Sequence, residues 1–188
     1  GKPNGGVRPI ALMPMLYRLW TKIRRTDIHK WDETHTGPWD AAIRGSSALR
    51  AAVVGAMYDE VASLNGESVA TILWDMEKFY DNVRIHKLAR QIRVTDYPSR
   101  IGYLGLLMHM SPRILRGYNH HVLCAMPTNA IIAGCTQSTT FAKILLMDIM
   151  QTMYTMDTMQ CNLYGSQIRT FVDDIRITHR GHPIGVSR

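Results

Sequence analysis

The sequence is poor in cysteine and has no long apolar run. Its three cysteines, Cys124, Cys135 and Cys161, form no C-x-x-C pair, so they indicate neither a zinc site nor a disulfide framework. No apolar run approaches the ~18 residues of a membrane span, and the first residues lack the pattern of a signal peptide. We therefore expect no membrane-spanning segment and a reducing, intracellular compartment.

Internal repeats, low-complexity segments and linkers are also missing. The chain has 188 residues, of which 46% are hydrophobic, and this is enough for one domain with a buried core. It begins without Met and stops soon after residue 174. We expect residues 1–188 to form a single domain that is truncated at both ends, a piece of a longer protein.

Acidic residues are scarce near the N-terminus. The formal net charge of the chain is +7 and its pI is about 9.5. Residues 1–30 contain one acid, Asp27, and seven basic residues, namely Lys2, Arg8, Arg18, Lys22, Arg24, Arg25 and Lys30. Because a solvated helix face usually interleaves both signs, this bias favours a polyanionic partner such as nucleic acid.

The spacing of apolar residues predicts a mixture of helices and strands. Strands are expected where apolar and β-branched residues run together, at residues 68–76, 112–125 (as a hairpin), 163–172 and 175–179. Helices are expected at residues 14–31, from a cap at Ser46 or Ser47 to residue 64, and at 84–93, 98–110 and 138–156. The 68–76 segment is typical of a buried, central strand, and it ends at Asp75. This order predicts an α+β fold, an antiparallel sheet with helices on one face.

Two adjacent aspartates, Asp173 and Asp174, interrupt the apolar and β-branched residues 170–177. The pattern predicts strand, turn and strand, with the aspartates at the tip. Two carboxylates held side by side repel each other, and in a buried hairpin they are costly to keep ionised unless a divalent cation neutralises them. An ordinary polar turn is the alternative, because Asp is common in turns.

Asp75 supplies a third carboxylate at the end of the 68–76 strand. Three carboxylates on two neighbouring strands suit a pair of Mg²⁺ ions about 3.5–4 Å apart, of which one activates an attacking hydroxyl and the other holds triphosphate oxygens. Mg²⁺ binds through a few carboxylates together with substrate phosphates, and it keeps water elsewhere. Asp75, Asp173 and Asp174 are therefore candidate metal ligands and catalytic residues.

Five short segments, taken together, point to a known family. Residues 2–10 are Lys-Pro-Asn-Gly-Gly-Val-Arg-Pro-Ile, residues 37–48 contain Gly-Ser-Ser, residues 75–83 begin Asp-x-x-x-x-Tyr-Asp, residues 134–138 are Gly-Cys-Thr-Gln-Ser, and residues 171–174 are Phe-Val-Asp-Asp. In this order they resemble the fingers motif, the Gly-rich segment and motifs A, B and C of a reverse transcriptase. The Gly-rich segment is similar to that of non-LTR retrotransposon and group II intron enzymes. The resemblance covers nearly the whole chain.

The resemblance implies a right-hand polymerase fold without its thumb, in which residues 1–67 form part of the fingers and residues 68–188 the palm with a fingers-side insertion. The implied activity is template-directed nucleotidyl transfer by the RNA-directed DNA polymerase of a retroelement. Its partners would be an RNA template, a DNA or RNA primer, dNTPs, and an endonuclease or other retroelement domain. Its cofactor would be Mg²⁺, as two ions held by Asp75, Asp173 and Asp174, with Mn²⁺ as a possible substitute.

The resemblance also implies roles in nucleotide binding. Tyr80 falls at the steric-gate position, where its ring would occupy the place of a ribose 2′-OH and favour dNTPs over NTPs. Lys2 and Arg8 would clamp the triphosphate, Arg8 by bidentate geometry and Lys2 as a point charge. Gln137 would contact the nascent base pair or the template, and Gly134 would let the backbone approach the nucleotide.

Two positions depart from the family pattern. Motif B usually reads Gln-Gly, whereas this chain has Gln137-Ser138, and Ser138 is a good N-cap residue for the helix that follows. Phe79 stands where the family has a small residue before the gate. Two alternatives stay open: a degenerate retroelement fragment that binds nucleic acid without catalysis, and an RNA-templated RNA polymerase, against which the aromatic Tyr80 argues.

Overall fold

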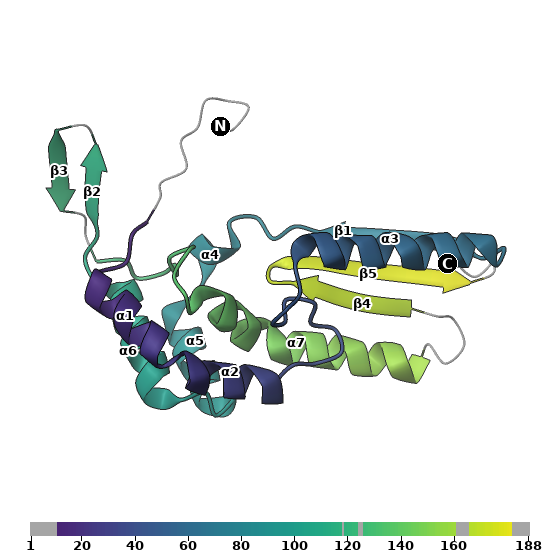
Figure 1. The fold of residues 1–188 in the computed structure, drawn as a ribbon, viewed down its shortest axis with the longest axis horizontal. Coiled ribbons are helices and arrows are strands. Elements are labelled where there is room, and N and C mark those ends of the chain that lie inside the picture. Colours follow the sequence, from purple (N-terminus) through teal and green to yellow (C-terminus); the bar gives the residue numbers. More distant parts are fainter. Residues whose placement is uncertain (1–10, 118, 124–125, 161–165, 182–188) are drawn as a thin grey trace. The chain divides into compact units, whose positions relative to one another are not determined.

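The computed structural model describes residues 11–117, 119–123, 126–160 and 166–181 (Figure 1). It divides into two compact units, Gly1–Asp32 with Tyr80–Phe141 and Glu33–Phe79 with Ala142–Arg188. The expected boundary between fingers and palm near residue 67 is a different division, which these units do not test. Among the described residues, no helix is both long and apolar enough to cross a membrane.

The first unit is mainly helical. Its elements are α1 (Met15–Ile23), most of α2 (Arg25–Thr34) and of α4 (Phe79–Asn82), α5 (Ile85–Val94), α6 (Ser99–Met110), and the strands β2 (Ile114–Gly117) and β3 (His120–Leu123). The helix expected at 14–31 is thus two helices, which meet at Arg24. The hairpin expected within 112–125 is confirmed, since β2 and β3 pair antiparallel.

The second unit contains the main sheet. Its elements are α3 (Ala48–Leu64), β1 (Ser68–Trp74), β4 (Ser166–Phe171), β5 (Asp174–Gly181) and most of α7 (Ser138–Gln160), which begins in the first unit. The strand order is β1-β5-β4, and both pairs are antiparallel. The expected cap of α3 is confirmed at Ser47, whose hydroxyl accepts a hydrogen bond from the Arg50 backbone N–H at 3.1 Å. A mixed fold of helices with an antiparallel sheet is therefore present.

Helices contact both faces of this sheet, which corrects the expectation of helices on one face. On one face, Ile168 and Ile175 form a buried cluster with Leu146 and Met150 of α7. Arg176, the next residue along β5, points to the other face, where it donates a hydrogen bond to the Gly55 carbonyl of α3 at 3.1 Å. The difference arises because side chains alternate between the two faces of β5. Ile175 and Ile177 pack in the cluster with α7, whereas Arg176 contacts α3.

The strand β1 lies at an edge of the sheet, so its expected position as a buried, central strand is wrong. It pairs with β5 alone among the described strands, and β5 is the central one. Ile72, Leu73 and Trp74 keep 52%, 74% and 53% of their surface exposed. An apolar, β-branched run therefore indicated a strand here, but not its burial, because burial depends on which elements cover it.

Candidate functional site

The two adjacent aspartates lie at the tip of the hairpin formed by β4 and β5. Phe171 and Asp174 are the last paired residues, so Val172 and Asp173 form a two-residue turn. Val172 has a φ of 61°, a left-handed conformation that is costly for a β-branched residue and common at functional turns. The turn leaves Asp173 half-buried and Asp174 exposed.

The register of the sheet places Asp75 next to these aspartates. Trp74, the last residue of β1, pairs with Ile175 of β5. Asp75 directly follows Trp74, and Asp174 directly precedes Ile175 on the antiparallel partner. Partial burial raises the pKa of Asp174 above its ordinary value, and the neighbouring charges of Asp173 and Asp75 raise it further. The fold therefore brings together, in one unit, the three carboxylates that the sequence analysis selected.

The chemistry of these three side chains fits Mg²⁺ bound jointly with a substrate. Carboxylate oxygens are the hard ligands that Mg²⁺ prefers, and their mutual repulsion is what a cation would relieve. Within the described part of the chain, which includes all three aspartates, no group of three or more His, Cys, Asp or Glu residues is arranged to hold a metal ion by itself. An ion held by one or two carboxylates and completed by substrate phosphates and water fits this arrangement better than an ion in a closed protein cage.

A segment far away in sequence supports the hairpin. Asp40 forms a parallel bridge with Thr170, in which Thr170 N–H donates to the Trp39 carbonyl at 2.7 Å and Ala41 N–H donates to the Thr170 carbonyl at 2.8 Å. Nζ of Lys143 lies 2.6 Å from Oδ2 of Asp40, and both side chains are buried. Sequence reasoning missed this pair. Lys143 is the one charged residue in the mostly apolar stretch 138–147, and a lysine in such a place indicates a buried ion pair.

Tyr80, at the expected steric-gate position, belongs to the first unit. It lies in the short helix α4 and is half-buried, and its backbone carbonyl accepts a hydrogen bond from Ile131 N–H at 2.9 Å. These contacts fix the backbone beside Tyr80. They do not test its role as a gate, which stays a prediction.

Gln137 is fully buried in the first unit between two tyrosines. Its amide Nε2 donates to the Tyr17 hydroxyl at 3.0 Å, and its Oε1 accepts from the Tyr97 hydroxyl at 3.3 Å. Burial is the main cause that raises the pKa of both hydroxyls, so they stay protonated at neutral pH. Contact between Gln137 and a nucleotide stays a prediction, and it requires this side chain to leave its two partners.

The turn before α7 has two further features of the predicted motif B. Gly134 has a φ of 89°, a conformation that favours glycine, and a Cβ added there would meet no atom within 4 Å. Ser138 is the first residue of α7 instead of its cap, and its hydroxyl donates to the Ile132 carbonyl at 2.6 Å. The bond to Ile132 holds the turn closed, so the expected capping role of Ser138 is wrong.

Lys2 and Arg8, the expected triphosphate clamp, lie outside the described residues, and their role stays a prediction. A comparison with curated proteins found no matching sequence. A comparison with protein-family models matched residues 1–184 to the family described as "Reverse transcriptase (RNA-dependent DNA polymerase)". This match covers nearly the whole chain, including Asp75, Asp173 and Asp174, so the chain belongs to the reverse transcriptase family.

Proposed function

We propose that this chain carries out template-directed nucleotidyl transfer as an RNA-directed DNA polymerase, with Asp75, Asp173 and Asp174 as its catalytic carboxylates. The observation that carries the proposal is the pairing of Trp74 with Ile175, because Asp75 and Asp174 adjoin this pair, beside the turn that holds Asp173. The raised pKa of Asp174 supports the same grouping, because the charges of Asp173 and Asp75 add to the effect of desolvation. RNA template, primer and dNTPs are the proposed partners, and a retroelement of the non-LTR or group II type is the proposed parent.

In this mechanism the three carboxylates together hold two Mg²⁺ ions. When bound, these ions lower the pKa of the attacking hydroxyl and stabilise the leaving pyrophosphate. The pairing of Trp74 with Ile175 fixes the two strand ends next to Asp75 and Asp174, so little ordering of the backbone would be needed when the substrate arrives. Tyr80 would exclude a ribose 2′-OH, and Lys2 and Arg8 would hold the triphosphate by charge.

Primer extension on an RNA template tests the catalytic assignment. We expect Asp173→Asn and Asp174→Asn each to reduce dNTP incorporation by at least ~100-fold, because each removes a negative charge that would help to bind Mg²⁺. Glu60→Gln is the matched control, since it removes an exposed carboxylate from α3 of the same unit. Incorporation by Asp173→Asn at the level of Glu60→Gln would show that the assignment is wrong.

A non-catalytic nucleic-acid-binding module is the second candidate function. It is favoured by the burial of Gln137, whose amide is occupied by two tyrosines. Carboxylates grouped beside a polyanion weaken its binding unless a metal is present, so the two candidates differ in metal uptake. Calorimetric titration with Mg²⁺ or Mn²⁺ separates them: uptake that is lost in Asp75→Asn supports the polymerase, and no Asp75-dependent uptake supports the binding module.

Substrate choice distinguishes a reverse transcriptase from an RNA-templated RNA polymerase. We expect Tyr80→Ala to incorporate NTPs that the wild-type protein rejects, because the ring that would occupy the place of the 2′-OH is gone. Tyr80→Phe keeps the ring and should keep the rejection. Equal rejection of NTPs by Tyr80→Ala and the wild type would refute the gate assignment.

A further inference from the structure

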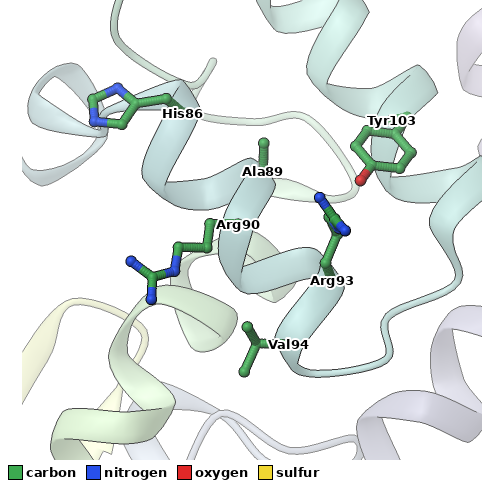
Figure 2. Close-up of a pocket in the computed structure, with 6 residues that line it drawn as sticks. All are labelled: His86, Ala89, Arg90, Arg93, Val94 and Tyr103. Atoms are coloured by element: carbon green, nitrogen blue, oxygen red, sulfur yellow. The ribbon is translucent and has the colours of Figure 1, made fainter.

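A pocket with a volume of about 680 Å³ opens between α5 and α6, inside the first unit (Figure 2). This volume lies in the range of pockets that hold small ligands. The residues that line it are His86, Ala89, Arg90, Arg93, Val94 and Tyr103. Five of them come from α5, and Tyr103 comes from α6. All six of these residues belong to the first unit, whereas the three aspartates belong to the second.

The amphipathic pattern of α5 explains why basic side chains line the pocket. Ile85, Leu88 and Ile92 are buried, and they follow helical spacing along one side of the helix. Arg90 and Arg93 occupy another side, where both are exposed. Packing of the apolar side of α5 therefore leaves two guanidinium groups at the pocket.

The two helices that line the pocket carry basic side chains and no acidic ones. Residues 82–110 contain one acid, Asp96, and five basic residues, namely Arg84, Lys87, Arg90, Arg93 and Arg100. No ion pair or hydrogen bond of the Arg90 or Arg93 guanidinium group occurs among the described residues. A solvated helix face usually interleaves both signs, so this bias indicates an anionic partner.

The pocket also presents an aromatic ring beside the arginines. Tyr103 is 40% exposed, and Figure 2 shows its side chain near that of Arg93, while Arg90 extends to the other side of α5. Aromatic rings stack on nucleic-acid bases, and guanidinium groups bind phosphates through paired hydrogen bonds. A simple anion would use only the arginines, whereas a nucleotide uses both chemistries at once.

We propose that this pocket binds one nucleotide of a single-stranded nucleic acid, with the phosphodiester between Arg90 and Arg93 and the base stacked on Tyr103. Ala89 adds a small apolar surface to the same pocket. This contact goes beyond the proposed polymerase function, because it needs neither dNTPs nor metal ions. It gives the chain a contact with a nucleic-acid strand in the first unit, in addition to the carboxylates of the second unit.

Binding of a fluorescein-labelled ten-nucleotide oligouridylate, measured by anisotropy in EDTA without dNTPs, tests the role of the arginines. We expect Arg90→Gln/Arg93→Gln to weaken binding and to reduce the slope of log K against log salt by roughly 0.7 to 1.4, since each phosphate contact on a single strand contributes about 0.7. Arg44→Gln/Arg50→Gln is the matched control, because it removes two exposed arginines from the second unit. Equal effects of the two double variants would overturn the proposal.

Tyr103 variants test the stacked base. We expect Tyr103→Leu to weaken oligouridylate binding by roughly 5- to 100-fold, the effect of losing one stacked base, and Tyr103→Phe to bind as the wild type does. An abasic oligonucleotide of the same length should bind wild type and Tyr103→Leu equally. Wild-type affinity in Tyr103→Leu would overturn the proposal.

Two further probes identify the source of the nucleotide. Oligodeoxyuridylate is compared with oligouridylate, and Arg90- and Tyr103-dependent binding of either strand supports the proposal. Binding of phosphatidylserine vesicles through these residues, without binding of either oligonucleotide, would overturn it in favour of a membrane contact. Because EDTA is present throughout, a failure here is distinct from a failure of the catalytic carboxylates.

Discussion

The buried ion pair between Lys143 and Asp40 gives a sharp test of how the aspartate hairpin is supported. Nζ of Lys143 on α7 lies 2.6 Å from Oδ2 of Asp40, with 7% and 3% of the side chains exposed. The Asp40 Oδ1 atom accepts a hydrogen bond from the Ala42 backbone N–H at 2.9 Å, and Lys143 also donates to the Thr36 hydroxyl at 3.3 Å. Loss of one partner would leave the other charge buried without compensation.

We predict that Lys143→Met lowers the free energy of unfolding by about 3–5 kcal/mol, the cost of an uncompensated buried charge. Asp40→Asn should be destabilising by a similar amount. The double variant should recover to within roughly 1–2 kcal/mol of the wild type, because no unpaired charge remains. Urea denaturation followed by far-ultraviolet circular dichroism measures all three variants. Lys22→Met, at an exposed lysine, serves as the control and should change the free energy by less than about 0.5 kcal/mol.

The same variants should loosen the hairpin locally. The backbone of residues 39–41 is hydrogen-bonded to Thr170, three residues before Asp173. Hydrogen exchange at the amides of Ala41 and Thr170 should therefore accelerate in Lys143→Met more than exchange in α5 of the first unit does. Additive costs in the double variant, or a cost below ~1 kcal/mol in Lys143→Met, would refute the reasoning.

Three further predictions concern titratable and buried polar groups. Burial, and to a lesser extent the charge of Arg113, lowers the pKa of His109 from 6.5 to about 4. Because the unfolded state binds the proton more tightly than the native state, the free energy of unfolding should fall by about 3 kcal/mol between pH 6.5 and 4. An equal fall in His109→Gln would contradict this. Gln137→Leu should cost about 1–3 kcal/mol in urea denaturation, since it removes the hydrogen bond of the buried Tyr97 hydroxyl and leaves the Tyr17 hydroxyl with Cys135 alone, and a neutral outcome would contradict it. The raised pKa of Asp174 means that its ionised form destabilises the native state. Asp174→Asn should therefore raise the urea midpoint at pH 7, and this gain should disappear below the ordinary carboxyl pKa. A gain that persists at pH 3 would show that the ionised carboxylate is not its cause.

Local patterns in the sequence were sufficient for the type of most elements. The hairpin that carries Asp173 and Asp174, the Ser47 cap of α3 and the pairing of β2 with β3 all occur where apolar periodicity and turn residues predict them. These features depend on residues close in the chain, whose conformational preferences act within a few positions. The same reasoning selected Asp75 as a residue at a strand end.

Placement was beyond the reach of these patterns. An apolar run indicates a strand but not its neighbours, so β1 proved to be an exposed edge and α3 and α7 proved to cover opposite faces. The motif B resemblance selected Gln137 for nucleotide contact, whereas the fold turns its amide toward Tyr17 and Tyr97. Such outcomes depend on contacts between residues that are far apart in the sequence, such as Tyr17 and Gln137, or on which surfaces remain to be covered.

The sequence by itself determined the family, the adjacent aspartates at a hairpin tip and the basic character of the chain. Only the tertiary structure decided that the strand end before Asp75 pairs with the residue after Asp174, and that Asp40 and Lys143 form a buried ion pair beside Thr170 of β4. The physical reason is that strand register and buried charge pairing are set by long-range packing. A shift of one residue in register would turn Asp75 to the other face of the sheet, and the sequence pattern alone does not exclude that shift.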